Sequence, residues 1–147
     1  MKPSIKLLLL ITVVGVFLTT GLLIAKGTSK PNSSKTILWE TNLPKAFAEA
    51  RHNHQPLLLD FYATWCGPCQ MLKKITWGNA QVIRAMHKWI PVHLNVDYHH
   101  HLDNQYKVSA IPMVVFLKPN GKIINTSVGF EYPGTMLKLM KQAYSQR

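Results

Sequence analysis

The only two cysteines of the chain, Cys66 and Cys69, are separated by Gly67 and Pro68 in the stretch "DFYATWCGPCQ". A Cys-x-x-Cys pair can form half of a metal site, a structural disulfide or a redox pair. Structural zinc needs four ligands, usually from two such pairs, and this chain has one pair. A structural disulfide stabilises most when it closes a long loop, and here only two residues lie between the cysteines. The spacing therefore favours a redox pair that cycles between dithiol and disulfide.

The pair is expected to lie at the start of a helix. Pro68 suits a first helical turn, so Cys66 would sit at the helix N-terminus. Unpaired N–H groups and the helix macrodipole favour a thiolate there. Stabilising the thiolate also stabilises the dithiol form and makes the disulfide more oxidising. Cys69 lies one turn further on, and we expect it to be buried and to remain a thiol until it resolves a mixed disulfide.

The sequence around the pair alternates short apolar runs with helical patterns, which predicts a small α/β sandwich. The run "PLLLDFYA" is typical of a strand buried on both faces. "MVVFL", a Pro-Asn-Gly turn and a second apolar run predict a hairpin. The expected elements, in order, are a helix at 43–54, a strand at 56–63, a helix from the cysteines to about 89 with an interruption at 77–79, a strand at 90–96, a short helix or loop at 99–108, the hairpin at 113–129 and a helix at 133–147.

The beginning of the chain differs from the rest in composition. An uncharged apolar run extends from Leu7 to Ala25, and as a helix it would rise about 28 Å, close to the thickness of about 30 Å of a bilayer core. We interpret residues 1–27 as a signal peptide or membrane anchor, and favour an uncleaved anchor because no clean small-residue cleavage site follows. Residues 28–36 are then a linker and residues 37–147 one domain. Because an N-terminal signal or anchor directs the export of the residues that follow it, we expect this domain to lie outside the cytoplasm.

The chain is strongly basic, with 17 Lys and Arg against 6 Asp and Glu and a formal net charge of +11. Such an excess suits nucleic acid, an anionic membrane surface or an acidic partner. Because Lys73-Lys74 is the only adjacent basic pair and no basic stripe is interleaved with aromatics, we expect no nucleic-acid site and a diffusely basic surface. The three histidines at 99–101 cannot all face one ion on a regular element, so we expect a surface loop or helix start and no metal site.

The residues around the pair resemble the thioredoxin superfamily over nearly the whole domain. "WCGPC", residues 65–69, matches the family's active-site motif residue for residue. "SAIPMVVF" matches the segment that holds the family's cis-proline, and "PNGKIINTSVGF" resembles its closing hairpin. The resemblance implies the thioredoxin fold, a central mixed β-sheet flanked by helices, here preceded by the N-terminal apolar segment. It also implies thiol–disulfide exchange that requires no cofactor.

The resemblance implies a role for individual residues of the motif. Cys66 would attack a substrate disulfide and Cys69 would resolve the intermediate. Asp60, six positions before Cys66, matches the family's buried acid, which is thought to take the proton from the resolving thiol. Trp65 would shield the disulfide. The residues expected to support the active site are Trp65, Gly67 and Pro68, and those expected only to pack are Trp39, Phe61, Tyr62, Trp77 and Trp89.

A substrate groove is implied by the resemblance as well, together with two departures from the family. Pro112 would be cis beside the disulfide, Ile111 would offer backbone to the substrate, and Gly129 would lie by the groove. The family's usual mid-helix proline falls at Lys74, which puts the helix kink in question. A lysine that pairs with the buried acid aligns with His93. This histidine is either part of a proton relay that titrates nearer neutral pH or a partly exposed strand residue.

The stretch at 73–97 is similar to the C-terminal domain of the thiol:disulfide interchange protein DsbD. Because Gly-Pro between the cysteines resembles reducing thioredoxins, we expect a reductase of disulfides in extracytoplasmic proteins. Its expected partners are disulfide-bearing clients, a membrane or periplasmic electron donor, and the membrane through residues 7–25, with a monomeric chain. The alternatives are a disulfide-forming oxidase, a non-catalytic adaptor or metal-binding module of the same fold, and a basic membrane-surface binder.

Overall fold

The computed structural model of the chain describes residues 35–147. The apolar run at 7–25 and nearly all of the expected linker at 28–36 lie outside the described residues, so the anchor and the domain boundaries stay predictions. None of the helices within 35–147 combines the length and the apolar character that a membrane span requires.

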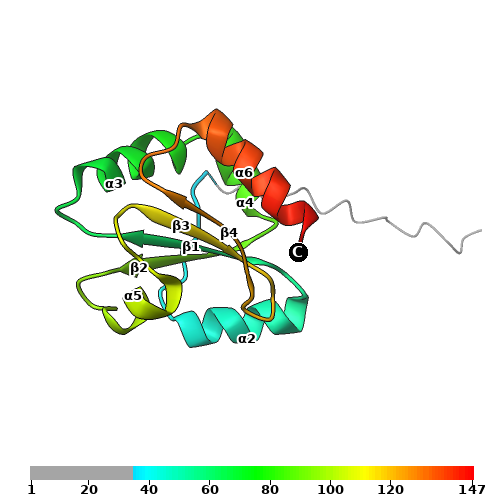
Figure 1. Cartoon of the computed structure of the whole chain (residues 1–147). Coiled ribbons are helices and arrows are strands. Elements are labelled where there is room, and N and C mark those ends of the chain that lie inside the picture. The colour runs from blue at the N-terminus through cyan, green and yellow to red at the C-terminus, as the bar shows by residue number, and fades with distance from the viewer. Residues whose placement is uncertain (1–34) are drawn as a thin grey trace, which may run out of the picture. The chain divides into compact units, whose positions relative to one another are not determined.

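Four strands form one mixed sheet in the order β2-β1-β3-β4 (Figure 1). The central strand β1 (Leu57–Tyr62) runs parallel to β2 (Ile90–Asn95) and antiparallel to β3 (Met113–Leu117), which pairs antiparallel with β4 (Ile123–Val128). The first five residues of β1 are all buried, as expected for a strand covered on both faces. The expected α/β class with a mixed sheet is therefore confirmed.

Helices cover both faces of the sheet (Figure 1). On one face lie α2 (Leu43–Asn53) and α5 (His101–Tyr106), so the "short helix or loop" is a helix. On the other face lie α3 (Gly67–Met71), α4 (Ala80–Met86) and α6 (Pro133–Ser145). The side chains of β1 alternate between two apolar cores, which explains why this strand carries an almost unbroken apolar run.

The helix that follows the cysteines changes its winding instead of ending. α3 continues into η1 (Leu72–Thr76), a π-helical turn, and the expected interruption follows before α4 begins. Lys74, at the family's proline position, lies inside η1, so the helix departs from regular winding here without a proline. Gly78 ends this passage in a tight turn, where an added Cβ would lie 2.6 Å from the Lys74 carbonyl oxygen. Asn79 then caps α4 by accepting from the N–H groups of Gln81 and Val82.

The segment before α2 extends the sheet at the outer edge of β2. Glu40 forms a parallel bridge with Val92, and its carboxylate accepts hydrogen bonds from the N–H groups of Thr41 at 2.8 Å and Asn42 at 2.9 Å. The same carboxylate forms an ion pair with Lys45. The hydrogen bond from Lys45, followed by the two backbone N–H groups, lowers the pKa of Glu40 from 4.5 to about 2.

We predict that the Glu40 carboxyl titrates at about pH 2 in carboxyl-resolved NMR. Because the pKa in the folded chain lies below the ordinary value of 4.5, these contacts stabilise the fold above that pH and lose their effect as the pH falls toward 2. Lys45→Met removes the largest cause and should move the titration toward 4.5. Lys138→Met, on α6 across the sheet, is the matched control and should leave it unchanged. A Glu40 titration that ignores Lys45→Met would contradict this assignment.

Candidate redox site

Cys66 and Cys69 form a disulfide at the start of α3, with a sulfur–sulfur distance of 2.04 Å. Cys66 is the N-cap residue, and its Sγ accepts a hydrogen bond from the backbone N–H of Cys69 at 3.2 Å. Each cysteine is only 5% exposed. The Cys66 sulfur thus lies where the free N–H groups of the helix start point, the position at which a thiolate is stabilised.

The loop before β3 approaches the Cys66 sulfur directly. The Ile111–Pro112 peptide bond is cis, as the resemblance implied, and the Ile111 carbonyl oxygen lies 3.8 Å from Cys66 Sγ. Gly129, just after β4, donates its N–H to the Pro112 carbonyl at 2.8 Å. Gly129 has φ of +94°, a conformation that favours glycine, and an added Cβ would meet nothing within 4 Å. The structure therefore brings together Ile111, Pro112, Gly129 and the cysteines.

A hollow of about 260 Å³ opens beside the pair, lined by Trp65, Val96 and residues 108–111. Trp65 is 71% exposed, and its ring stands at the rim of this hollow. The indole Nε1 lies 3.2 Å from both carboxylate oxygens of Asp97. The sequence analysis did not single out Asp97. Its contact with Trp65 could have been expected, because Asp97 follows β2, Trp65 follows β1, and neighbouring parallel strands end at the same edge of a sheet.

Asp60 is 2% exposed in the middle of β1. Its Oδ2 accepts a hydrogen bond from Trp77 Nε1 at 2.8 Å, and His93 Nε2 lies 3.3 Å from the same oxygen. Its Oδ1 is buried without a hydrogen-bond partner among the residues that the structure describes. One carboxyl oxygen is thus held in place, and the other is available to take a proton.

The side chain of Asp60 shares a face of the sheet with the cysteines. Tyr62 follows two positions later on β1, so both side chains point to the same side. Tyr62 packs against the cluster formed by Ala63, Cys66 and Cys69. Trp77, which holds Asp60, belongs to the core beneath α4 and α6 on that side. The sequence analysis treated Trp77 as a packing residue only. Because a buried indole N–H needs a hydrogen-bond acceptor, the sequence could have indicated that Trp77 has a polar partner in the core.

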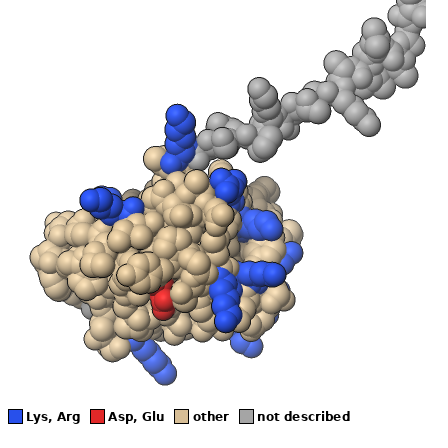
Figure 2. Space-filling view, turned by 90° about the horizontal axis from the view of Figure 1, so that it is seen from above, with Lys and Arg blue, Asp and Glu red and all other residues tan. Residues whose placement is uncertain are grey.

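The outer surface of the helical layer that carries the cysteines is basic. The partly buried hydrophobic residues packed against the pair are Tyr62, Val96 and Ile111. Residues 66–89 and 133–147 contain seven Lys or Arg and no Asp or Glu, whereas the rest of 35–147 contains six of each kind. The net charge of +7 on the described residues therefore lies on the layer of α3, η1, α4 and α6, which Figure 2 views from above. The surface is asymmetric, not diffusely basic.

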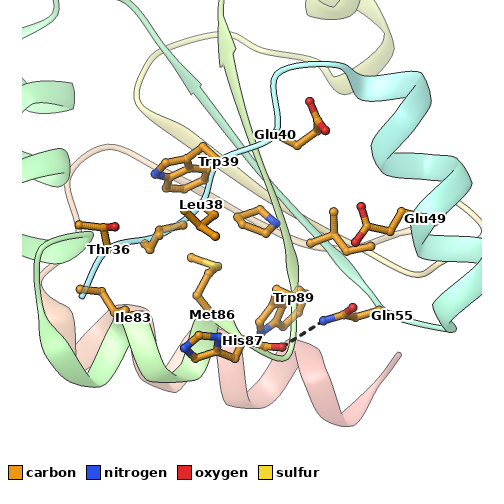
Figure 3. Close-up of a pocket in the computed structure, with 13 residues that line it drawn as sticks. Thr36, Leu38, Trp39, Glu40, Glu49, Gln55, Ile83, Met86, His87 and Trp89 are labelled. Carbon is orange, nitrogen blue, oxygen red and sulfur yellow. Dashed lines mark hydrogen bonds between the residues drawn. The ribbon is translucent and has the colours of Figure 1, made fainter. Parts of the chain in front are cut away.

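A larger hollow of about 370 Å³ lies away from the cysteines, near the start of β2 (Figure 3). It is bordered by residues 36–40, by Glu49 and Gln55 from the region of α2, and by the end of α4. Gln55 Nε2 donates to the carbonyl of His87 at 3.1 Å across its floor. The redox pair lies at the other end of the parallel strands. The candidate site is therefore identified by the cysteine chemistry and not by the volume of the larger hollow.

No metal site accompanies the redox pair in the described part of the chain. Within 35–147, no group of three or more His, Cys, Asp or Glu is arranged to hold a metal ion. His101 begins α5, and the rings of His99 and His101 lie 6.1 Å apart, centroid to centroid.

Two sulfurs bonded at a helix start, with a peptide carbonyl beside one of them, can exchange their bond with another disulfide or with two thiols. Together with the four-stranded mixed sheet, this arrangement defines a thiol–disulfide oxidoreductase of the thioredoxin type. A model of the family described as thioredoxin-like matches residues 38–119, more than half of the chain. The chain belongs to this thioredoxin-like family.

Relatives and solved structures agree with this assignment. A thioredoxin of Mycoplasmoides gallisepticum is 31% identical over 88 residues, covering 60% of this chain and 84% of the relative. Thioredoxin-1 of Drosophila melanogaster is 34% identical over 87 residues, covering 58% and 79%. A structure titled "DsbH Oxidoreductase" superposes with a TM-score of 0.68 at 18% identity, covering 90% of this chain and 99% of that one, and shows the shared fold. Oxidised mitochondrial thioredoxin 3 of Saccharomyces cerevisiae, 31% identical, has a TM-score of 0.56 and covers 71% and 93%.

We predict that Trp77→Phe lowers the free energy of unfolding by about 2 kcal/mol or more, because a hydrogen bond to a charged group contributes about 1.5–3 kcal/mol. Denaturant unfolding of the oxidised protein measures the change. Trp65→Phe is the matched control: the ring is exposed and its partner Asp97 is at the surface, so the loss should stay below about 0.5 kcal/mol. Equal effects of the two substitutions would show that the Trp77–Asp60 hydrogen bond does not stabilise the fold.

Proposed function

We propose that this protein reduces disulfide bonds in client proteins outside the cytoplasm, with Cys66 and Cys69 as the exchanging pair. The observation that carries the direction is the Gly67-Pro68 first turn of α3 between the cysteines, which resembles that of reducing thioredoxins. Strongly oxidising pairs owe their potential to a stabilised reduced form. The hydrogen-bond donor that the structure gives to Cys66 Sγ is the uncharged backbone N–H of Cys69, which stabilises a thiolate less than a cation would and so favours a reductant.

The exchange proceeds in two displacements. The Cys66 thiolate attacks one sulfur of the client disulfide, and the other client sulfur leaves as a thiolate. Cys69 then loses its proton and attacks Cys66 Sγ, which forms the Cys66–Cys69 bond and releases the second client thiolate. Two electrons pass from the pair to the client. Asp60 takes the proton of Cys69 on its unpartnered Oδ1.

The client chain is expected to bind in the hollow beside the disulfide. There Trp65 stands at the rim, and the Ile111 carbonyl is the backbone group nearest to Cys66. The N–H of Gly129 is already used by Pro112, so Gly129 shapes the loop. Gly67 and Pro68 form the first turn of α3 and position the sulfurs.

Location and electron supply follow from the N-terminal segment and the family resemblance. We propose that the apolar run at 7–25 serves as a signal or, more specifically, as an anchor that keeps the domain at the membrane outside the cytoplasm. Because every turnover leaves the pair oxidised, a membrane or periplasmic donor must return two electrons. The similarity of residues 73–97 to the C-terminal domain of DsbD supports such a supply. No nucleic acid is needed, and one copy of the chain suffices.

The reduction potential of the Cys66–Cys69 pair tests the direction. Full-length protein in detergent is equilibrated with defined dithiothreitol or glutathione buffers, and the oxidised fraction is measured after thiol trapping. We expect a value near that of thioredoxin, about −270 mV. A value near about −120 mV would contradict the reductase proposal and favour a disulfide-forming oxidase.

Two single substitutions separate an enzyme from a non-catalytic adaptor or metal-binding module of the same fold. Cys66→Ser should reduce the rate of insulin reduction at least about a thousandfold, because the nucleophile is lost. Cys69→Ser should instead accumulate a mixed disulfide with the client, visible on non-reducing gels. If Cys66→Ser retained full biological activity, the protein would act as an adaptor.

A further inference from the structure

The outer surface of η1, α4 and α6 carries seven cationic side chains, and we call it the basic layer. All seven are exposed: Lys73 and Lys74 in η1, Arg84 and Lys88 in and after α4, and Lys138, Lys141 and Arg147 in and after α6. No Asp or Glu occurs within 66–89 or 133–147. None of the seven forms an ion pair with a carboxylate among the described residues. Their charge is therefore available to an anionic partner.

Contacts between the elements join these cations into one surface. The helix α6 packs against both α4 and η1, and Thr76 at the end of η1 donates a hydrogen bond to the carbonyl of Glu131, just before α6. At the other end of the layer, Lys88 and Arg147 both contact the ring of Tyr144, at 5.3 and 3.7 Å from its centroid. Figure 2 looks onto this layer and shows Lys and Arg side chains at several places, with little acidic surface between them.

The domain begins beside the same layer. Ile37 and Trp39 pack against the core beneath α4 and α6. Thr36 and Leu38 border the larger hollow together with the end of α4 (Figure 3). The chain that comes from the proposed anchor therefore enters the domain next to α4, at the border of the basic layer.

The connection between the proposed anchor and the domain is short. Ten peptide bonds separate Ala25 from Lys35. Even a fully extended chain of that length spans at most about 36 Å. A tether this short gives the bilayer surface a high effective concentration around the domain. Among the anionic surfaces that the cations could bind, the bilayer is thus the one that the chain itself keeps close.

We propose that the basic layer docks on a bilayer surface that contains anionic phospholipids, with its Lys and Arg side chains against the lipid phosphates. The proposal goes beyond the function proposed above. It rests on the anchor proposed there and not on the direction of electron transfer. Exposed apolar side chains suit the same surface: Met71 and Ile75, next to the cations of η1, are 46% and 40% exposed. Helices that lie in a membrane interface combine such side chains with Lys and Arg.

Docking in this way leaves the redox site open. The hollow beside the disulfide is lined by Trp65, Val96 and residues 108–111, none of which belongs to the basic layer. Cys66 caps α3, which continues directly into η1. A docked layer therefore holds the exchanging sulfurs beside the bilayer, where a membrane-held client or electron donor meets them in a restricted orientation.

The reactivity of lysine amines measures docking in the full-length protein. The protein is reconstituted into vesicles of phosphatidylcholine, with or without phosphatidylglycerol, and treated briefly with a membrane-impermeant acetylating reagent. Peptide mass spectrometry then gives the rate at each lysine. With phosphatidylglycerol, Lys73 and Lys74 should react at least about fivefold more slowly, since one cation alone contributes about that factor to binding. Lys118 and Lys122, in the turn whose Gly121 lies next to Phe47 of α2, should react equally in both kinds of vesicle.

Salt and substitutions test whether charge causes the protection. It should be full at an ionic strength of about 0.01 M, where the screening length is about 30 Å, and vanish at about 1 M, where it is about 3 Å. The combined change Lys88→Gln, Lys138→Gln and Lys141→Gln should abolish the protection of the two η1 lysines, because the contributions of three cations are lost together.

The matched control removes three cations from the other side of the domain. Arg51→Gln, Lys118→Gln and Lys122→Gln together should keep the protection of the η1 lysines, and thermal unfolding shows whether each variant is folded. The proposal is overturned if these lysines react equally in neutral and anionic vesicles, or if the folded control loses protection as fully as the variant of the basic layer.

Two further measurements separate docking from its alternatives. Polyglutamate added to neutral vesicles represents an acidic protein partner. Protection of the η1 lysines by polyglutamate, without protection by phosphatidylglycerol, would overturn the lipid assignment. Flotation of the protein with neutral vesicles measures the anchor alone. A chain that does not float with them would contradict the proposed anchor, while the comparison of lysine reactivities would still decide whether the basic layer docks.

Discussion

The burial of one carboxyl group in the central strand constrains most of the architecture around the site. A carboxyl group in an apolar interior is tolerated only where hydrogen-bond donors meet it. Asp60 obtains one from Trp77 and a close contact from His93, and both arrive from other parts of the chain. Trp77 directly follows the π-helical turn η1 and precedes Gly78, where an added Cβ would lie 2.6 Å from the Lys74 carbonyl oxygen. The second oxygen, Oδ1, is buried without a hydrogen-bond partner among the described residues.

The two faces of the sheet differ in the residues that they bury. Beneath α2 and α5, the core is apolar and closes with Leu102 and Tyr106, and burial raises the pKa of the Tyr106 hydroxyl. The other face carries Asp60, His93 and the cysteine pair, and its helices bear the excess positive charge on their outer side. The strand β1 joins the two by alternating its side chains between them. Each face has an apolar core, and the cysteine pair packs beside the core under α4 and α6.

Much of the fold could be predicted because its signals are local. The apolar run of β1, the Pro-Asn-Gly turn with Gly121 at φ +88° and the helical spacing that buries Met136 and Met140 in α6 each depend on nearby residues. The place of the cysteines also follows from local chemistry, since Pro68 begins a helix. The winding of η1 could not be predicted, because Lys74 has no local property that specifies a π-helical turn.

The contacts between distant residues were the part that sequence reasoning missed or left open. Trp65 and Asp97 are 32 positions apart, and so are Gln55 and His87. They meet only because β1 and β2 lie parallel, so that the corresponding ends of the two strands are adjacent. The gathering of basic side chains on one layer has the same origin: their spacing along the chain looked diffuse, and folding α3, α4 and α6 onto one face concentrated them.

By itself, the sequence determined the chemistry of this protein. It contains a single Cys-x-x-Cys pair, it predicts that a helix begins at this pair, and it carries the residue types of a thioredoxin-like family member. Only the tertiary structure decided how that chemistry is controlled. It placed His93 against Asp60 between two aromatic rings, where the sequence had left two interpretations open. The physical reason is that a residue's type and its local spacing fix what it can do. Strand register and burial, which depend on the whole chain, fix which groups it meets and whether water reaches them.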